Sequence, residues 1–312
     1  MTKYLVTGGA GFIGSHIVDA LVGNGEEVRV LDNLSTGSKE NLAGIENRID
    51  FVQGDIRSYH LVTEAVHGVK YVIHQAALPS VPRSVRDPIT TAAVNIMGTL
   101  NVLYAAKEAG VRRVIFASSS SVYGDNPALP KQEDMLPMPL SPYAVSKLSG
   151  EQNCQVFWRV YGLETICLRY FNVFGPRQNP ESQYAAVIPK FITSMIARQP
   201  VTVHGDGRQS RDFTYVQNVV QANLLACSAP EAAGRVLNIA CGKRYSLLEL
   251  IAELSTLCGV EPDAMHTPPR IGDVPHSQAD ISCARAVLGY EPDVAFTQGL
   301  KRTVDWYRGE QL

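Results

Sequence analysis

The sequence predicts an α/β fold, in which helices cover both faces of a doubly wound parallel sheet and a smaller mixed α/β region follows toward the C-terminus. Three observations support this prediction. Short apolar runs alternate with longer amphipathic segments through the first half of the chain. The apolar runs are almost continuous, which is typical of parallel strands buried on both faces and joined by right-handed helical crossovers. After Gly175 the pattern changes to short helical segments mixed with proline-rich loops.

The predicted elements follow in a regular order. Strands are expected at residues 3–8, 27–32, 49–55, 69–77, 111–119 and 163–175. Helices are expected at residues 12–25, 95–110 and 141–162, each of which ends at a glycine. Two later segments, a helix at 216–229 and a strand at 235–240, are expected to return to the same sheet.

Composition and charge place the chain among ordinary globular proteins. It has 312 residues, 45% of them apolar, and a formal net charge of −2. The charge is nearly balanced, so we expect no nucleic-acid or membrane partner. We find no apolar run near the roughly 20 residues that span a bilayer and no signal-peptide pattern, and we therefore expect a cytoplasmic protein. The six scattered cysteines are expected to be reduced thiols, with neither a disulfide set nor a metal site.

A glycine-rich turn follows the first predicted strand. In VTGGAGFIG, the glycines Gly8, Gly11 and Gly14 allow the backbone to approach a pyrophosphate at the start of the next helix. Asp32 ends the second strand, eighteen positions after Gly14, where its carboxylate can bind ribose hydroxyls and repel a 2′-phosphate. The alternative is a plain tight turn, but the complete context predicts an NAD site. Asp55 ends the third strand and is expected near the adenine amino group, unless it only caps the next helix.

These signals define the expected domain organisation. Residues 1–173 form a Rossmann-type NAD-binding domain, to which residues 213–240 return. Residues 174–312 mainly form a smaller substrate domain, placed over the carboxyl edge of the sheet.

A tyrosine and a lysine lie on one face of a predicted helix. Tyr143 and Lys147 are four residues apart, about one helical turn. Such a pair is common on solvated helices, but this one follows a dinucleotide motif and a strand that ends in four serines. A tyrosine in water has a pKa of about 10, and a neighbouring ammonium together with a nicotinamide charge favours the phenolate. With a serine hydroxyl on the same oxygen, this group can take a proton from an alcohol while hydride leaves the carbon.

These motifs resemble those of the extended short-chain dehydrogenase/reductase family, and more closely its nucleotide-sugar 4-epimerase branch. The matching segments run in order along nearly the whole chain: TGGAGFIG, DNLSTG, QGDIR, HQAA, NIMGTLNVL, SSSSVYG, SPYAVSK, LRYFNVFGPRQ, GDGRQSRDFTYV, LNIACG and RIGDVPHSQAD. The resemblance implies C4 epimerisation of a UDP-hexose through a transient 4-keto sugar, with NAD kept between turnovers. It implies Tyr143 as the base, Lys147 as the group that lowers its pKa, and Ser119, four residues before Tyr123, as the hydroxyl partner.

The resemblance also implies the ligand-binding residues. The expected cofactor-binding residues are Gly8, Gly11, Phe12, Ile13, Gly14, Asp32, Asn33, Ser35, Thr36, Gly37, Asp55, Ile56, Gln75, Ala76, Ala77, Asn95, Ser118, Tyr143, Lys147, Tyr170 and Val173. The expected substrate-binding residues are Ser80, Arg83, Ser119, Ser120, Ser121, Tyr143, Asn172, Ala186, Val187, Phe191, Arg211, Arg270, Asp273 and Ser277. Among these, Asn172, Arg211 and Arg270 match diphosphate contacts, for which a bidentate guanidinium is well suited, and Asp273 matches a ribose contact.

The serine run distinguishes between two reactions of this family, epimerisation and 4,6-dehydration. Sugar 4,6-dehydratases of the family carry an Asp-Glu pair directly after the catalytic hydroxyl residue, where an acid and a base are needed for elimination. Ser120 and Ser121 occupy those positions here. Because neither hydroxyl can serve as the acid, the resemblance favours epimerisation.

Three residues suggest the sugar. In the family, a bulky aromatic four positions after the Asp273 position restricts the pocket to plain hexoses, whereas Ser277 leaves room for an N-acetyl group; alternatively, Ser277 is a loop serine without steric meaning. Ser80 and Arg83 lie in a segment that resembles the branch acting on UDP-N-acetylhexosamines and sometimes on uronic acids. UDP-N-acetylglucosamine or its C4 epimer is therefore the preferred substrate in this interpretation.

Three alternatives remain open at this stage. The protein could be a 4-epimerase of UDP-glucose or UDP-glucuronate, or a nucleotide-sugar decarboxylase or reductase on the same scaffold. A silent NAD-binding scaffold is disfavoured, since Ser119, Tyr143 and Lys147 are all present.

The resemblance also implies a homodimer, in which helices 95–110 and 142–162 pair with their copies in a four-helix contact.

Overall fold

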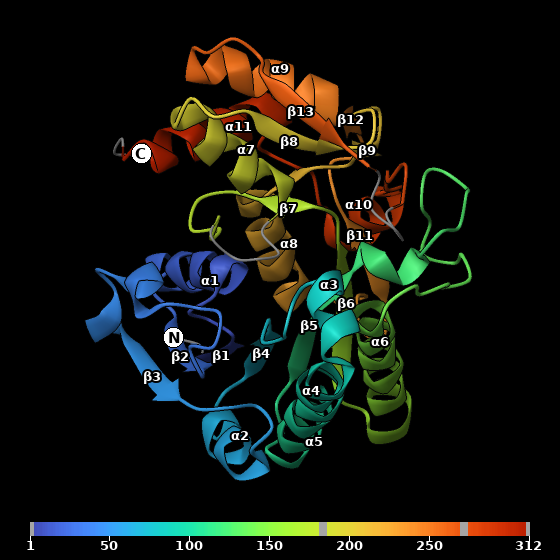
Figure 1. Ribbon diagram of the computed structural model, residues 1–312. Helices are drawn as coiled ribbons and strands as arrows, with labels where there is room; N and C mark the ends of the chain where they lie inside the picture. Colours follow the sequence, from blue (N-terminus) through green and yellow to red (C-terminus); the bar gives the residue numbers. More distant parts are fainter. Residues whose placement is uncertain (1–2, 181–185, 269–273, 310–312) are drawn as a thin grey trace.

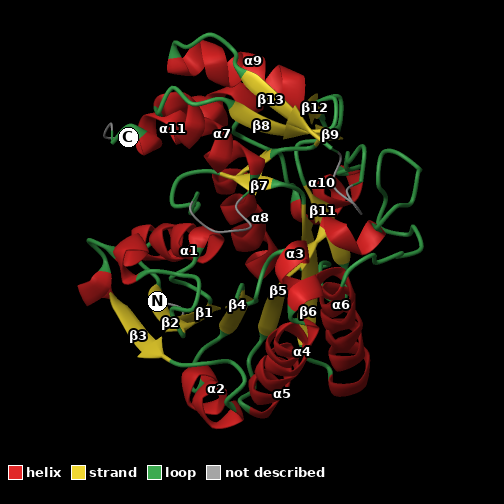
Figure 2. Ribbon diagram, in the orientation of Figure 1, coloured by secondary structure: helices red, strands yellow, loops and turns green. Residues whose placement is uncertain are grey.

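The computed structural model describes residues 3–180, 186–268 and 274–309. Its main layer is a seven-stranded sheet in the order β11-β6-β5-β4-β1-β2-β3, with every neighbouring pair parallel. These strands are β1 (Lys3–Thr7), β2 (Glu27–Asp32), β3 (Ile49–Gln53), β4 (Tyr71–His74), β5 (Arg113–Ser119), β6 (Glu164–Tyr170) and β11 (Val236–Ile239). The predicted α/β fold with a doubly wound parallel sheet is therefore confirmed (Figures 1 and 2).

Helices cover both faces of this sheet. One apolar core joins the sheet to α1 (Phe12–Gly23), α8 (Val216–Ser228) and α10 (Ser282–Leu288). The other core joins it to α2 (Tyr59–Val66), α5 (Thr99–Glu108) and α6 (Pro142–Tyr161). Alternating helical crossovers thus bury the nearly continuous apolar strands from both sides. The contribution of α10 to this core was not predicted, because its seven residues carry only a weak helical pattern.

The smaller layer stands above the carboxyl edge of the sheet (Figure 1). It contains α7 (Val187–Ile196), α9 (Leu247–Cys258) and α11 (Phe296–Tyr307), with β8 (Val201–His204) paired in parallel to β13 (Ala264–Thr267). Two short two-stranded pairs connect the layers, namely β7 (Val173–Phe174) with β10 (Thr214–Tyr215) and β9 (Ser210–Arg211) with β12 (Tyr245–Ser246). A core of its own, rich in aromatic rings, holds this layer together.

Two elements differ from the predicted ones by more than shifts of a few residues at their ends. The predicted strand 163–175 is broken into β6 and β7, because Asn172 between them has φ 35°, a left-handed conformation that no strand accommodates. The predicted helix 95–110 begins earlier, since α4 (Pro88–Ala92) and a π-helical segment (η3, Ala93–Gly98) lead directly into α5.

This continuous helix differs from our expectation that no apolar segment is near the length that spans a bilayer. Residues Pro88–Glu108 form a 21-residue helix that is long and apolar enough to cross a membrane by length and composition. Half of its most apolar window is buried inside the protein, however, as in the core helix of a globular domain. The remaining helices are α3 (Val81–Arg86) and three short 3-10 turns, η1 (Lys39–Leu42), η2 (Glu46–Arg48) and η4 (Ser120–Tyr123).

Candidate functional site

A first cavity of about 320 Å³ lies where the carboxyl ends of the central strands meet α6. The glycine-rich turn forms one of its walls. Gly8 has φ 71°, and a Cβ placed on it would lie 2.7 Å from the backbone nitrogen of Ala76. A Cβ on Gly14 would lie 2.1 Å from the carbonyl oxygen of Gly8. The turn therefore presents backbone rather than side chains to the cavity, as a pyrophosphate at a helix N-terminus requires.

Two carboxylates line the far end of this cavity. Asp32 is buried, and its two oxygens accept the backbone N–H groups of Ala10 at 2.9 Å and Leu34 at 2.8 Å. Each oxygen keeps a second lone pair for a ribose hydroxyl. Asp55 accepts hydrogen bonds from Asn33 and Arg57, and the Arg57 contacts lower the pKa of Asp55 to about 2. The glycine turn and these carboxylates fit a dinucleotide without a 2′-phosphate.

Most of the residues that we expected to bind the cofactor line this cavity. They are Gly8, Gly11, Phe12, Ile13, Gly14, Asp32, Asn33, Ser35, Thr36, Asp55, Ile56, Gln75, Ala76, Ala77, Ser118, Tyr143, Lys147 and Tyr170. The sequence motifs did not identify the other lining residues, which are Leu31, Gly54, Arg57, Leu78, Pro79, Thr90, Val94 and Ala117. Four of these, Gly54, Arg57, Leu78 and Pro79, follow strand ends next to residues that we had named.

Three expected cofactor residues do not line the cavity. Gly37 packs behind the glycine-rich turn, where a Cβ would lie 2.6 Å from the backbone of Ala10. Val173 lines the second cavity instead. Asn95 is buried, and its amide accepts the N–H of Leu78 at 2.8 Å and donates to the carbonyl of Leu78 at 3.1 Å. Asn95 therefore shapes the cavity wall from behind.

The expected catalytic residues converge at the inner end of the cavity. Both Tyr143 and Lys147 line it from the first turns of α6, and Ser119 is a neighbour whose side chain favours the charged form of Tyr143. The Lys147 ammonium donates to the carbonyl oxygen of Ala117 at 2.8 Å. It also lies 5.1 Å from the ring centre of Phe116 and 5.8 Å from that of Tyr143. The end of β5 and one face of α6 thus bring Ser119 to the Tyr143–Lys147 pair, which follows it by more than twenty residues in the sequence.

Burial is the main cause of the pKa shifts of Tyr143 and Lys147. It raises the pKa of Tyr143 above its ordinary value, and the side chain of Ser119 opposes that rise. This direction differs from the lowered tyrosine pKa that we expected, because desolvation disfavours the phenolate. Burial also lowers the pKa of Lys147 to about 8, and the negative charge of Glu151 opposes that shift.

The serine run has distinct roles at successive positions. The Ser118 hydroxyl donates to the buried carboxylate of Glu151. The Ser119 hydroxyl accepts the backbone N–H of Ser121 at 3.1 Å and begins η4. The Oγ atom of Ser121 is buried and has no hydrogen-bond partner within the described part of the chain, and Ser120 is partly exposed beside it.

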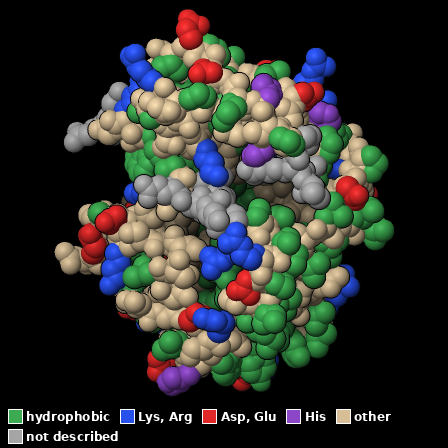
Figure 3. Space-filling model, in the orientation of Figure 1, with side chains coloured by type: hydrophobic (Ala, Val, Ile, Leu, Met, Phe, Trp, Pro, Cys, Tyr) green, Lys and Arg blue, Asp and Glu red, His purple; other side chains and the backbone are tan. Residues whose placement is uncertain are grey.

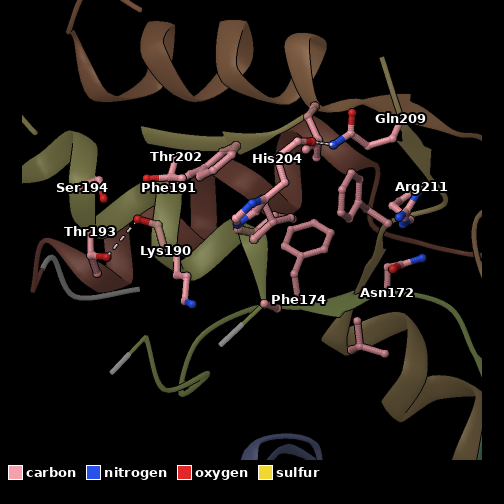
Figure 4. A pocket seen from close by; sticks show the side chains of 16 residues that line it. Asn172, Phe174, Lys190, Phe191, Thr193, Ser194, Thr202, His204, Gln209 and Arg211 are labelled. Carbon is pink, nitrogen blue, oxygen red and sulfur yellow. Dashed lines mark hydrogen bonds between the residues drawn. The ribbon is translucent and has the colours of Figure 1, made fainter. Parts of the chain in front are cut away.

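A second cavity of about 540 Å³ lies between α7, β8 and the chain after β6 (Figure 4). Five of its lining residues were expected to bind substrate: Asn172, Ala186, Val187, Phe191 and Arg211. The others are Val173, Phe174, Ile188, Lys190, Thr193, Ser194, Thr202, His204, Gln209, Phe213 and Leu247. Figure 4 shows Lys190 and Arg211 on opposite sides of Phe174 and His204, so positive charge flanks an aromatic centre.

Once β8 and α7 are placed, their periodicity explains why some of the missed residues face the cavity. Thr202 and His204 alternate with the buried Val201 and Val203 along β8, so both face the cavity. On α7, Lys190 follows Val187 by one helical turn and therefore shares its face. The short, irregular connections in this half gave no pattern long enough to predict these elements.

Hydrogen bonds to backbone carbonyls hold two residues that we expected to contact the diphosphate. Asn172 lies in the left-handed region, and its amide donates to the carbonyl of Asp212 at 3.3 Å. Arg211 donates to the carbonyls of Ser210 at 3.0 Å and Pro275 at 3.1 Å. The guanidinium is thereby held at the rim of the second cavity, close to the loop that follows residue 273.

The remaining expected substrate residues are dispersed. Ser80 has φ 96°, and its hydroxyl begins α3 by accepting the N–H of Arg83. Arg83 lines the first cavity rather than the second. The backbone N–H of Ser277 donates to a carbonyl of β9 at 3.0 Å, which places this residue beside the strand that carries the expected diphosphate arginine. Arg270 and Asp273 lie outside the described residues.

The distribution of positive charge fits an anionic ligand. Figure 3 shows Lys and Arg side chains on both sides of the region between the two layers. Within residues 3–180, 186–268 and 274–309, no group of three or more His, Cys, Asp or Glu side chains could hold a metal ion.

Comparison with known proteins places this arrangement in a wider group. Residues 4–240 match the NAD dependent epimerase/dehydratase family. The chain is 40% identical over 312 residues to the UDP-glucose 4-epimerase of Mycolicibacterium smegmatis, and the match covers 99% of each protein.

Two solved structures have nearly the same fold. The UDP-N-acetylglucosamine 4-epimerase from Methanobrevibacter ruminantium M1, in complex with UDP-N-acetylmuramic acid, has a TM-score of 0.95 and 40% identity, and the match covers 99% of this chain and 98% of that one. The UDP-glucuronic acid 4-epimerase from Bacillus cereus, in complex with UDP-glucuronic acid and NAD, has a TM-score of 0.92 and 34% identity, with 99% of each chain covered.

Proposed function

This chain belongs to the NAD dependent epimerase/dehydratase family, and from that premise we propose that it is an NAD-dependent UDP-sugar 4-epimerase whose preferred substrate is UDP-N-acetylglucosamine or UDP-N-acetylgalactosamine. One observation carries the proposal. Tyr143 and Lys147 lie together, with Ser119 as a neighbour, at the inner end of a cavity built for a dinucleotide. Each of the three groups has a separate task in moving a proton on a sugar hydroxyl.

The proton at the sugar 4-hydroxyl is handled by Tyr143. Its phenolate takes that proton, and Ser119 holds the same oxygen through a hydrogen bond. NAD, when bound, supplies reversible hydride acceptance. Tyr143 then returns the proton after the sugar has presented its opposite face, so the net change is inversion at one carbon without net oxidation.

The Lys147 ammonium supports the charged form of the tyrosine. It lies 5.8 Å from the Tyr143 ring centre in a buried setting, where a positive charge favours the phenolate more strongly than it does in water. This effect opposes the burial that raises the pKa of Tyr143. The bound cofactor adds a second positive charge at the nicotinamide. Glycines of the first turn, together with Asp32 and Asp55, would hold its adenosine half.

Ser120 and Ser121 favour epimerisation over elimination. Neither side chain can supply the acid or the base that removal of a hydroxyl group requires. Epimerisation needs only one proton site and one hydride site, and Tyr143 with the cofactor meets that need. A silent NAD-binding scaffold is disfavoured because the three catalytic groups are both present and brought together.

The proposal for an N-acetylated sugar rests on Ser277. This small residue is held beside β9 by a backbone hydrogen bond, next to the strand that carries Arg211 into the second cavity. Arg83, which lines the first cavity, is the residue that would bind a carboxylate, and it keeps UDP-glucuronate as the second candidate. UDP-glucose epimerisation, and a decarboxylase or reductase on the same scaffold, are further alternatives. Asp32 argues against a reductase that depends on NADPH.

A two-part experiment tests the proposal. The protein is purified without added cofactor and analysed for retained NAD, and UDP-N-acetylglucosamine, UDP-glucose and UDP-glucuronate are then offered separately while the C4 epimer is followed by NMR. We expect retained NAD and the fastest turnover on the N-acetylated sugar, and a Tyr143→Phe variant should keep NAD but lose activity. If none of the three sugars is interconverted, the epimerase proposal is wrong. Turnover confined to the other two sugars would refute only the argument from Ser277.

The assembly and the location are part of the same proposal. We infer a cytoplasmic homodimer in which the exposed faces of η3, α5 and α6 pair with their copies. In support, Met97 is 54% exposed, Tyr104 44%, Val145 48% and Val156 49%, although α6 already buries its opposite face against the sheet. A helix that is apolar on both faces is typical of burial between two partners.

A further inference from the structure

A buried ion pair lies one helical turn behind Lys147. The carboxylate of Glu151 on α6 accepts two hydrogen bonds from the guanidinium of Arg169 on β6, both at 2.8 Å. Side-chain exposure is 3% for Glu151 and 4% for Arg169. The hydroxyl of Ser118, the first residue of the serine run, donates to the same carboxylate. Glu151 lies on α6, and side chains from β5 and β6 fix its carboxylate.

The stability of the fold does not explain this pair well. Removing two charges from water costs several kcal/mol per ion, and apolar residues of similar volume often stabilise a protein as well or better. The arginine is also held on its other side, because its guanidinium lies 4.7 Å from the ring centre of Tyr123 and donates to the carbonyl of Glu133. A carboxylate kept charged and immobile at this cost suggests a function.

Glu151 lies on the same face of α6 as Tyr143 and Lys147. Tyr143, Lys147 and Glu151 are spaced at intervals of four residues on α6 and therefore form one row on the face that meets the sheet. Both Lys147 and Glu151 are almost fully buried, so their charges interact through a medium that screens weakly.

We propose that Glu151, oriented by Arg169 and Ser118, is a positioning residue that keeps the Lys147 ammonium protonated beside Tyr143. This inference rests on the proposed role of Lys147 in the epimerase reaction. Glu151 does not touch the reacting atoms in this scheme. It acts through Lys147, while Ser118 ties its carboxylate to the end of β5, where Ala117 accepts the ammonium hydrogen bond.

The titratable groups around Lys147 agree with this role. Burial lowers the pKa of Lys147 to about 8, and Glu151 is the charge that opposes the shift. From β4, His74 faces the ammonium, but burial and Lys147 lower the pKa of His74 to about 3, so this imidazole is neutral. From α6 itself, Tyr143 carries a charge only as the phenolate that takes the sugar proton. From β6, Arg169 is positive but is paired to Glu151, and the buried thiol of Cys167 has a raised pKa.

The test measures the protonation of Lys147 directly. Full-length protein with bound NAD is labelled with [ε-13C]lysine, and the Lys147 resonance is assigned by comparison with a Lys147→Met variant. We expect the NMR titration of Lys147 in Glu151→Gln to shift to a pKa lower than wild type by about half a pH unit or more, as loss of a nearby opposite charge produces. The alkaline limb of the kcat–pH profile should move in the same direction, with KM little changed.

Further variants keep the test decisive. Glu164→Gln breaks a comparable pair, in which Arg113 contacts Glu164 at 2.7 Å at the other end of the sheet, and it should leave the Lys147 titration unchanged. If Glu151→Gln is too unstable because Arg169 is left unpaired, the double variant Glu151→Gln/Arg169→Met is compared with Arg169→Met alone, so that the loss of the arginine charge cancels. Glu151→Asp should restore the wild-type titration.

A Lys147 titration that is unchanged or shifted upward in folded Glu151→Gln would overturn the inference. The NMR readout does not depend on turnover, so it separates this inference from the proposed function, which fails if the wild-type protein interconverts none of the sugars.

Discussion

The ring of Phe116 lies against the bare Cα of Gly150, and the Lys147 ammonium stands 5.1 Å from the centre of the same ring. The glycine allows β5 and α6 to approach closely at the point where the proposed catalytic lysine projects. A Cβ on Gly150 would lie 2.2 Å from the Cζ atom of Phe116, a distance that real contacts do not allow.

The first prediction concerns this contact. Gly150→Ala should destabilise the protein by about 1–3 kcal/mol, because overpacking forces the ring or the helix to move. Turnover should fall as well, since Phe116 and Lys147 move together. Chemical denaturation and the NMR assay of C4 exchange measure the two effects. Gly23→Ala on α1, where a Cβ would meet nothing within 4 Å, is the matched control and should be neutral or slightly stabilising. Equal stability of the two variants would contradict the packing argument.

The second prediction concerns Asn95 and retention of the cofactor. Its amide binds both backbone groups of Leu78 and donates to Ser146 at 3.0 Å, and Leu78 lines the NAD cavity. Asn95→Ala leaves these buried groups unpaired, which should cost about 1–3 kcal/mol. We expect purified Asn95→Ala to lose NAD faster than wild type during dialysis. Undiminished NAD retention, together with lowered stability, would show that Asn95 supports only the fold.

The third prediction is a pH dependence of stability that arises from Asp212. This carboxylate is fully buried and accepts the backbone N–H groups of Cys241, Gly242 and Ala279. Burial raises the pKa of Asp212 from 3.8 to about 7, although these three donors oppose the rise. The folded state therefore binds one proton more than the unfolded chain between those two values, and the free energy of unfolding falls as pH rises through that window.

The size and the test of this effect follow from the same numbers. The two pKa values differ by 7 − 3.8, about three pH units, which corresponds to an effect on the order of 4 kcal/mol at 1.36 kcal/mol per unit. Urea unfolding of wild type and Asp212→Asn at the two ends of the window measures it. Because Asn cannot ionise, its stability should depend less on pH. The prediction is wrong if the two proteins show the same dependence.

The sequence was informative where the signal is local or strictly periodic. The glycine-rich turn with Asp32 and the Tyr143–Lys147 pair depend on short spacings that a strand or helix translates directly into positions. Residues that matter through a partner on another strand could not be found in this way. Glu151 is one polar residue among several on α6, and only the buried Arg169 opposite it gives it significance.

Broken regularity limited the prediction elsewhere. Asn172, with its left-handed backbone, divides a segment whose apolar pattern is that of one strand. Lys190 and His204 line the second cavity from elements of ten and four residues, too short for a periodic pattern to identify. The fold class followed from the long alternating half of the chain, whereas the substrate cavity is made of short pieces brought together by tertiary contacts.

The last prediction tests the proposed homodimer. Val156 and Val160 lie one turn apart on α6 and are 49% and 66% exposed, so a charge introduced there enters the proposed interface. Val156→Glu should yield the mass of one chain in size-exclusion chromatography with light scattering, whereas wild type should yield the mass of two, because an unpaired buried carboxylate is costly at an apolar contact. Ile196→Glu, at a residue 40% exposed on α7 in the smaller layer, is the control and should remain dimeric. A wild-type protein with the mass of one chain would contradict the dimer itself, and a dimeric Val156→Glu would place the interface on another face.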